Sequence, residues 1–275
     1  KFDLKLASLL IENGECLNKP KLIAKNKDTK DNKNIKKFFK YDLLITAPFE
    51  FLEKERKKLE NIFNCNFLED LKKENVIREL NNSHAWLCQP SPEYKINKSI
   101  LKNALLLKTI ITPSTGTTHI DLDYCKKRNI KVVPITVSSD FKKIKASSEY
   151  TFMMGLLSMR KIFDSIRLTK QGYWRDVEKD LRGFELSDKK VAIVGFGRIG
   201  QNLLKYSLAF KAKPLAFDPY TKIKNKYLKS DLFEVISKAD LVFICISFSK
   251  KNIDFVNKNF ISKLKNAPAL INTSR

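Results

Sequence analysis

The sequence lacks any long apolar run, since no stretch of eighteen or more uncharged apolar residues occurs in it. A helix that crosses a bilayer needs about 20 such residues, so we expect no membrane span. The chain also lacks the basic and then apolar opening of a secretory signal, because it begins Lys1-Phe2-Asp3. We therefore expect a cytoplasmic protein with no membrane partner. The missing initiator Met indicates a start inside a longer reading frame.

Cysteine is scarce and scattered. None of the five cysteines forms a C-x-x-C pair, and an odd number does not suit a disulfide framework. Structural zinc sites need ligands at close, regular spacing, so we expect no metal site. The cysteines are expected to be buried or partly buried thiols in a reducing compartment: Cys16, Cys65, Cys88, Cys125 and Cys245.

Acidic residues are too few to balance the basic ones. Lys and Arg number 53 against 30 Asp and Glu, which gives a net charge of +23. Such a charge would suggest nucleic acid, but the excess is mostly Lys and accompanies abundant Asn, Ile and Phe, as A/T-rich codons would supply. No stripe of Arg and aromatic residues occurs, and acids accompany the lysines in residues 53–58. We therefore expect no nucleic-acid partner, and a field that attracts anionic substrates.

From Tyr41 onward, short apolar strands alternate with amphipathic helices. Residues 1–40 do not share this rhythm and are expected to be an N-terminal extension or linker. Such alternation predicts parallel sheets with helices on their faces. The rhythm occurs twice, with strands at 41–46, 84–88, 108–112 and 130–135, then at 191–194, 214–217, 241–246 and 269–271, and with helices at 51–63, 100–106, 120–128, 199–210, 231–238 and 260–264.

The most apolar helix is expected over residues 147–160, between the two rhythms. Ser147 or Ser148 is expected to cap its N-terminus, because serine hydroxyls accept hydrogen bonds from the free N–H groups there. A helix that is apolar nearly all round is normally buried. We therefore expect this helix to lie in a core and to join two domains.

A G-x-G-x-x-G pattern follows the first strand of the second rhythm, with its glycines at Gly195, Gly197 and Gly200. The first glycine allows a tight turn, the second lets the backbone approach a pyrophosphate, and the third lets helix and strand pack closely. Asp218 closes the next strand, where an acid accepts hydrogen bonds from the adenosine ribose and repels a 2′-phosphate. The pattern, placed between a strand and a helix, predicts NAD rather than NADP as cofactor.

Six stretches between Tyr41 and Arg275 form an ordered set. They are T-P-S-T-G-T-T-H-I-D at 112–121, S-E at 148–149, G-Y-W at 172–174, L-R-G-F-E-L at 181–186, the glycine loop through D-P-Y at 218–220, and I-N-T-S-R at 271–275. Together they resemble the D-isomer-specific 2-hydroxyacid dehydrogenases, which include D-3-phosphoglycerate dehydrogenase. The resemblance implies an α/β fold of two domains with parallel sheets: a flavodoxin-like substrate domain over 41–146, and a Rossmann nucleotide-binding domain over 147–275 that lacks its C-terminal part.

The resemblance also implies an activity, the transfer of a hydride between NAD and a 2-hydroxy or 2-keto acid, in a homodimer to which residues 172–186 contribute. It assigns the backbone at Thr115 and Gly116 to the substrate carboxylate. Arg275 matches the catalytic arginine, whose fixed fork of donors suits a carboxylate and a keto oxygen. The family usually has His and Pro at two of the implied cofactor contacts, Cys245 and Ser247. The full set of contacts is Gly195, Gly197, Arg198, Ile199, Gly200, Asp218, Cys245, Ser247, Thr273 and Ser274.

Histidine is nearly absent, and this bears on catalysis. The family uses a His, held by a Glu, as its general acid, and both lie beyond the position of Arg275. The only two histidines here, His84 and His119, match neither position. We therefore expect this chain to be a fragment, truncated at its C-terminus and inactive by itself. A natural, inactivated relative is the alternative.

Two further questions stay open at the level of sequence. The fold also suits a non-enzymatic, NAD-sensing binding module, as in the family's corepressor branch, which turnover with a panel of keto acids would exclude. The substrate is open because a phosphorylated acid needs a basic residue near residues 86–92, where the sequence offers Cys88, Gln89 and, further on, Lys95. D-3-phosphoglycerate is therefore one candidate among several.

Overall fold

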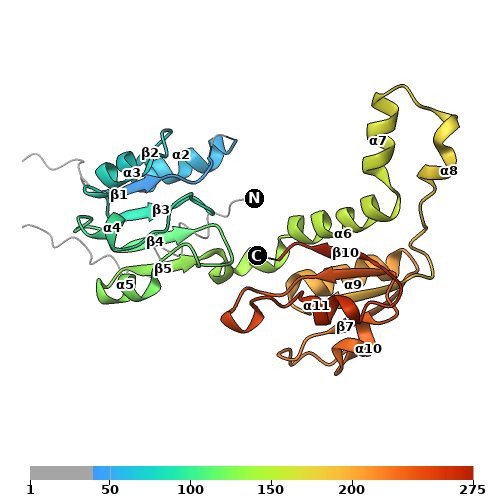
Figure 1. The fold of residues 1–275 in the computed structure, drawn as a ribbon. Coiled ribbons are helices and arrows are strands. Elements are labelled where there is room, and N and C mark those ends of the chain that lie inside the picture. The colour runs from blue at the N-terminus through green and yellow to red at the C-terminus, as the bar shows by residue number, and fades with distance from the viewer. Residues whose placement is uncertain (1–39, 50, 275) are drawn as a thin grey trace, which may run out of the picture. The chain divides into compact units, whose positions relative to one another are not determined.

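The computed structural model describes residues 40–49 and 51–274, so the expected N-terminal extension lies almost entirely outside the described residues. The chain divides after Phe141 into two compact units, each built on its own five-stranded sheet (Figure 1). All strand pairs in both sheets are parallel, as the alternation of strands and helices predicts.

The sheet of the first unit has the strand order β2-β1-β3-β4-β5. This is the flavodoxin-like order, in which ligands bind at the carboxyl ends of the strands, and it confirms the expected fold class. The strands are β1 (Asp42–Ile45), β2 (Asn64–Phe67), β3 (Ala85–Leu87), β4 (Thr109–Thr112) and β5 (Lys131–Pro134). The helices are α2 (Glu53–Ile62), α3 (Lys73–Leu80), α4 (Lys98–Leu101) and α5 (Leu122–Lys127).

Helices cover both faces of this sheet, which explains why its inner strands are apolar. β3 is buried at every position, as parallel strands covered on two sides are. One face packs against α3 and α4 through Leu80 and Ile100, and the other packs against α2 through Leu59. Trp86 lies in the first of these cores, and its indole nitrogen donates to Thr46 Oγ1 at 3.0 Å. The buried indole therefore leaves no polar atom without a partner.

The sheet of the second unit has the order β10-β9-β6-β7-β8. Its strands are β6 (Lys190–Val194), β7 (Lys213–Phe217), β8 (Leu228–Lys229), β9 (Leu241–Ile244) and β10 (Ala269–Asn272). Helices α9 (Arg198–Ala209), α10 (Leu232–Ile236) and α11 (Lys258–Ser262) connect them. The chain order reverses between β6 and β9, which is the switch point at which Rossmann sheets bind their ligands.

Helix α6 (Ala146–Met159) opens the second unit and is buried along one face only. Phe152 packs against Phe243 of β9, with ring centroids 6.2 Å apart. Gly155 lets the helix come this close, because a Cβ there would lie 2.7 Å from the Phe243 ring. The opposite face exposes Tyr150 and Met153. The expectation that this helix is buried all round was therefore wrong for that face.

The expected serine cap of α6 was also wrong. The helix begins at Ala146, and its N-cap position, Lys145, makes no side-chain cap. Ser148 lies inside the first turn, where it is fully buried and accepts a hydrogen bond of 3.0 Å from Asn202 Nδ2. Its hydroxyl therefore holds α6 against α9 and does not cap the N-terminus of α6.

Two further helices, α7 (Ile162–Lys170) and α8 (Glu178–Leu181), stand away from the second sheet (Figure 1). We call residues 160–184 the arm. Its base is closed where Phe184 N donates to Met159 O at 2.9 Å, and where Lys161 Nζ donates to Asp180 O at 2.8 Å. A Cβ on Gly183 would lie 2.6 Å from Met159 O, so the returning chain needs glycine to come this close.

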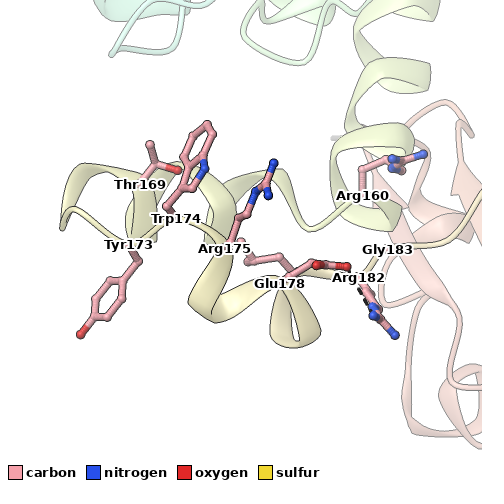
Figure 2. A pocket seen from close by; sticks show the side chains of 9 residues that line it. Arg160, Thr169, Tyr173, Trp174, Arg175, Glu178, Arg182 and Gly183 are labelled. Atoms are coloured by element: carbon pink, nitrogen blue, oxygen red, sulfur yellow. Dashed lines mark hydrogen bonds and ion pairs between the residues drawn. The ribbon is translucent and has the colours of Figure 1, made fainter.

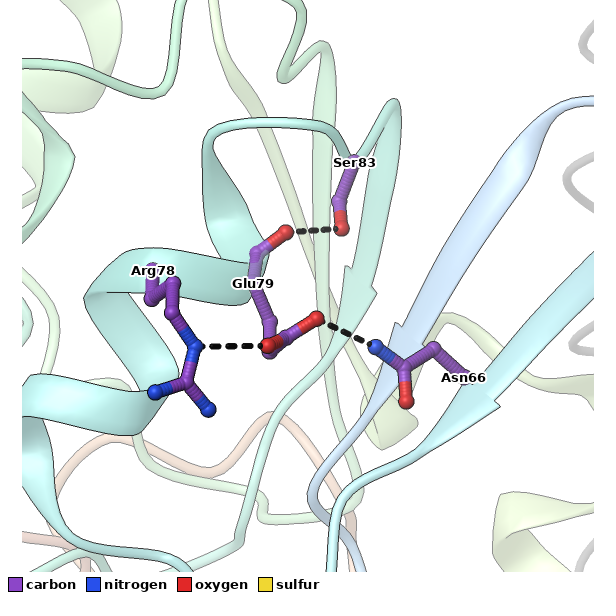
Figure 3. Close-up of polar contacts among 4 residues, drawn as sticks. All are labelled: Asn66, Arg78, Glu79 and Ser83. Atoms are coloured by element: carbon purple, nitrogen blue, oxygen red, sulfur yellow. Dashed lines mark hydrogen bonds and ion pairs between the residues drawn. The ribbon is translucent and has the colours of Figure 1, made fainter.

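Several elements were not predicted, among them β2, α3 and α7. The polar residues of β2 and α3 hide the pattern, yet they hold the two elements together (Figure 3). Glu79 Oε2 accepts from Asn66 Nδ2 at 2.8 Å, and Glu79 Oε1 accepts from Arg78 Nε at 3.0 Å. Ser83 Oγ donates to the Glu79 carbonyl oxygen at 2.8 Å. A strand at the edge of a sheet can use such polar pairs because one side remains wet.

Among the helices of the described residues, none is both long and apolar enough to cross a bilayer. Four of the five cysteines lie in the described part of the chain, and all four are free thiols. Cys88 and Cys125 are buried, while Cys65 and Cys245 are half-buried. This confirms that these four are buried or partly buried thiols, as expected; Cys16 lies outside the described residues.

Candidate cofactor and anion sites

The glycine loop, residues 195–200, connects β6 to α9 at the carboxyl end of the second sheet. Gly195 has a φ of +99°, a conformation that L side chains rarely adopt. A Cβ on Gly200 would lie 2.0 Å from the Gly195 carbonyl oxygen. These two glycines therefore allow the turn and the close approach of α9 to β6.

Gly197 differs from the other two glycines because the space beside it is open. A Cβ there would meet no heavy atom within 4 Å. Gly197 is the N-cap of α9 and offers no side chain to the free N–H groups of the helix. The positive end of this helix is thus available to an anion, and the pyrophosphate of a dinucleotide fits both its charge and the open space. Four other helices instead have an N-cap residue whose side chain accepts from a free backbone N–H group: Asn97, Asp121, Asp231 and Asn257.

Asp218 follows β7 and is held against the glycine loop. Its Oδ2 accepts from Phe196 N at 2.8 Å, and its Oδ1 accepts from Tyr220 N at 2.9 Å. A carboxylate has about four lone-pair sites, so about two remain for the hydroxyls of a ribose. The loop therefore positions the acid that would recognise the adenosine side of NAD.

Cys245 follows β9 and supports the glycine loop from the neighbouring strand. Its Sγ lies 3.3 Å from Val194 O and 3.1 Å from Gly195 O, so the two carbonyl oxygens share its single thiol proton. Burial raises the pKa of the Cys245 thiol to about 12, and the charge of Asp218 acts in the same direction. The thiol is therefore a neutral donor at physiological pH, and its contacts here are to the loop's backbone.

Two cationic side chains lie against the first half of α9. Arg198 Nη1 donates to the carbonyl oxygen of Ile144, just before α6. Burial lowers the pKa of Arg198, but a guanidinium stays protonated at neutral pH. Lys145 Nζ donates to Asn202 Oδ1 at 3.2 Å. Their positive charges add to the attraction of α9 for phosphate.

A pocket of about 250 Å³ opens at the carboxyl ends of β9 and β10, and Ser247 and Ser274 line it. Ser274 Oγ donates to Ile244 O at 3.2 Å, which holds the end of β10 against β9. Sequence reasoning missed the other polar residues of the lining, because no motif marks them: Asn252, Asp254 and Asn272.

The first unit carries a second candidate site in the loop after β4. The backbone N–H groups of Thr115, Gly116 and Thr117 donate to no other residue of the described chain. Successive free N–H groups form concave sites that bind anions. The carbonyl of Gly116 is held from within the loop, because Ser114 Oγ donates to it at 2.6 Å. This loop can therefore receive a carboxylate through its backbone.

The structure gathers most of the predicted cofactor residues at the carboxyl ends of β6, β7, β9 and β10. Thr273 is among them, although its hydroxyl lies 2.9 Å from that of Thr151 in α6. Thr115 and Gly116 lie in the other unit. Arg275 lies outside the described residues. The chemistry of these places fits a dinucleotide in one unit and a small anion in the other.

Comparison with known proteins agrees with this class. Residues 27–142 match the profile of the D-isomer specific 2-hydroxyacid dehydrogenase catalytic domain, and residues 152–275 match that of its NAD binding domain. The chain therefore belongs to the D-isomer specific 2-hydroxyacid dehydrogenase family, with NAD as its cofactor.

Two relatives show the level of similarity. The chain is 30% identical to the hydroxypyruvate reductase of Thermotoga maritima over 186 residues, 66% of this chain and 58% of that protein. It is 31% identical to the glyoxylate reductase of Thermofilum pendens over 212 residues, 74% of this chain and 60% of that protein. The chain thus spans about three fifths of the length of these relatives.

Solved structures show the same fold. The D-lactate dehydrogenase of Aquifex aeolicus, complexed with NAD and lactic acid, is 26% identical, has a TM-score of 0.66, and covers 85% of this chain and 69% of its own. The NAD-dependent formate dehydrogenase of Staphylococcus aureus has a TM-score of 0.71 at 24% identity, with coverages of 85% and 73%.

Two glycine variants separate cofactor binding from folding. Gly197→Val should weaken NADH binding by about tenfold or more, because its side chain would fill the space that fits the pyrophosphate, while stability falls by only about 1 kcal/mol from a poorer N-cap. Gly200→Ala should lower the free energy of unfolding by about 3 kcal/mol, because its Cβ would overlap the Gly195 carbonyl. Fluorescence titration with NADH and chemical unfolding measure the two effects. Unchanged NADH affinity in Gly197→Val would place the pyrophosphate elsewhere.

Proposed function

We propose that this protein is an oxidoreductase that transfers a hydride between NAD and a 2-hydroxy or 2-keto acid. One observation carries the proposal: the loop at residues 115–117 offers three backbone N–H groups without a partner in the described chain, in a chain that also has an NAD-binding domain. A protein that acts on a 2-keto acid needs, besides a dinucleotide site, an anion site that fits a carboxylate. The net charge of +23 would draw both anionic ligands.

We assign residues 41–146 to the substrate domain and residues 147–275 to the NAD-binding domain. The division of the chain after Phe141 and the start of α6 at Ala146 support this assignment. When bound, NAD supplies or accepts the hydride. The chain's own part is to hold the substrate carboxylate on the N–H groups at Thr115 and Gly116, and to hold the ribose on Asp218.

The cofactor is proposed to extend from Asp218, across Gly197, Arg198 and Ile199, toward the pocket lined by Ser247 and Ser274. Arg275 is proposed to clamp the carboxylate and the keto oxygen, since a guanidinium binds two oxygens at once. Neither histidine is assigned to the proton transfer. His84 Nδ1 lies 3.1 Å from Asp42 Oδ2, and His119 Nε2 lies 3.3 Å from Thr112 Oγ1, so each is committed to a neighbour within the first unit.

The proposed substrate is a small, unphosphorylated acid. A phosphate would need a basic side chain close to the segment after β3, but Cys88 there is buried, and burial raises its thiol pKa to about 12. The backbone N–H of Gln89 donates to Thr46 Oγ1 at 3.1 Å, so this N–H is not available to a phosphate. Glyoxylate and hydroxypyruvate, which name the two reductases compared above, are therefore the first substrates to test.

Turnover with a panel of acids tests the proposed reaction. In the full-length protein, NADH oxidation, followed by absorbance, should be fastest with glyoxylate or hydroxypyruvate and slow with 3-phosphohydroxypyruvate. A full-length protein that binds NADH but reduces no 2-keto acid would favour an NAD-sensing binding module. A preference for the phosphorylated acid would overturn the proposed substrate class.

The choice of NAD over NADP depends on Asp218. Asp218→Asn keeps the shape of the side chain but removes its charge, so it should narrow the preference for NADH by about tenfold or more, mostly by relieving repulsion of the 2′-phosphate. Asp218→Ala should also weaken NADH itself, because the ribose loses its acceptor. Titrations with NADH and NADPH measure both effects. A wild-type preference for NADPH would contradict the assignment.

We also propose that the protein is a homodimer, assembled partly through the arm. The arm exposes Trp174, which is 73% accessible, together with Phe163, Tyr173 and Phe184. Figure 2 shows the side chains of Trp174 and Arg175 pointing to the same side of the arm, and both residues line a pocket of about 570 Å³. Exposed apolar surface of this kind is typical of protein interfaces, where Trp, Tyr and Arg supply much of the binding energy.

A single exchange in the arm tests the dimer. Trp174→Ser should raise the dimer dissociation constant by about thirtyfold or more, since truncated interface tryptophans often cost 2 kcal/mol or more. Tyr220→Ser is the matched control, because Tyr220 is similarly exposed but lies outside the arm. Sedimentation velocity over a range of concentrations measures the constant. Equal behaviour of the two variants would exclude the arm as the interface.

A further inference from the structure

A chain of three side-chain contacts runs through the anion loop of the first unit. His119 Nε2 lies 3.3 Å from Thr112 Oγ1, and Thr112 Oγ1 lies 2.9 Å from Ser114 Oγ. Ser114 Oγ then donates to the carbonyl oxygen of Gly116 at 2.6 Å. Thr112 is fully buried and Ser114 is nearly so, while His119 is half-buried. The two hydroxyls are therefore shielded from water that could rearrange their protons.

Counting protons along this chain fixes its direction. A carbonyl oxygen can only accept, so the single hydroxyl proton of Ser114 is used on Gly116. The contact between the two hydroxyls therefore needs the proton of Thr112. Thr112 then has none left for His119, and the imidazole must donate from Nε2. The opposite order would leave two oxygen lone pairs facing each other at 2.9 Å in a buried place, which is costly.

This order has a consequence for the backbone of the loop. Ser114 holds the Gly116 carbonyl, and in a trans peptide the N–H of the next residue points opposite to the carbonyl. The chain therefore aims the Thr117 N–H away from Ser114, and that N–H donates to no other residue of the described chain. Holding a donor in place before the ligand arrives avoids an ordering cost on binding.

We propose that His119 is a positioning residue, which donates from Nε2 to Thr112 and so orders the hydroxyls that hold the anion loop ready for a substrate carboxylate. This inference rests on the proposed function of the loop. It predicts that any side chain with an N–H donor at this position preserves the order. Asparagine meets that requirement, whereas leucine does not.

The tautomer of His119 tests the proton order without any substrate. The ring nitrogens of the 15N-labelled chain should show His119 protonated at Nε2 at about pH 8, above the ordinary pKa of histidine of about 6.5. The chain has only two histidines, so the variant His84→Gln assigns the signals. A His119 ring protonated at Nδ1 alone would overturn the proposal.

Anion binding tests the consequence for the loop. Oxamate, a non-reacting mimic of a 2-keto acid, is titrated against chain labelled with 15N-glycine and saturated with NADH, and the Gly116 amide is observed. His119→Leu should weaken oxamate about fivefold, the size of one net hydrogen bond, and His119→Asn should restore wild-type affinity. NADH affinity should be equal in all three chains.

The outcomes separate this inference from the function on which it rests. Oxamate affinity that is the same with leucine and histidine would overturn the positioning role while leaving the anion site intact. Weak binding by both variants would overturn the donor requirement. No response of Gly116 in the wild-type chain, with the Nε2 proton in place, would instead overturn the anion site, and with it any role of His119 in substrate binding. Ser114→Ala, which removes the last donor, should match His119→Leu in oxamate affinity.

Discussion

The carbonyl oxygen of Gly195 lies 2.0 Å from the place where a Cβ on Gly200 would stand, and the cofactor site is built around this contact. Because α9 starts against β6, the N–H of Phe196 meets Asp218, and the Gly195 carbonyl meets the thiol of Cys245. Three strands thus reach one loop. Gly197 is the position at which nothing fills the space, so close packing on either side leaves one opening, at the positive end of the helix.

The two proposed anion sites are built differently because the helix that follows each loop differs. In α9, Gly197 leaves the N-terminal N–H groups free, so the helix itself can bind phosphate. In α5, which follows the loop of the first unit, Asp121 Oδ1 accepts from Tyr124 N at 3.0 Å. That carboxylate takes up the helix end and would repel a second anion. The loop must therefore use its own backbone, held by buried hydroxyls.

The sequence predicted the fold class and the position of the glycine loop because both depend on local patterns. Apolar strands buried on two faces, as in β3, are visible as runs, and glycines in a turn are visible by spacing. Helix α3 and strand β2 were missed because both are short and partly exposed, and carry polar residues such as Asn66 and Glu79, which bond to each other instead of packing in a core. The chain from His119 to Gly116 was also missed. Its parts are close in sequence, but the direction of their protons depends on distances that no residue pattern contains.

The burial of helix α6 was misjudged because part of its apolar surface is exposed in the single chain and would be buried only in the proposed dimer. Its sequence is apolar nearly all round, yet Tyr150 and Met153 are exposed while Phe152 and Gly155 are packed on Phe243. Hydrophobic periodicity reports every surface that a helix buries, including surfaces covered by another molecule. The exposed apolar face of α6 lies next to the arm, which carries Trp174 and Phe163. In the proposed homodimer, the partner subunit would cover this face. The sequence pattern of α6 then describes its burial in the proposed dimer, whereas the exposed residues describe the same helix in the single chain.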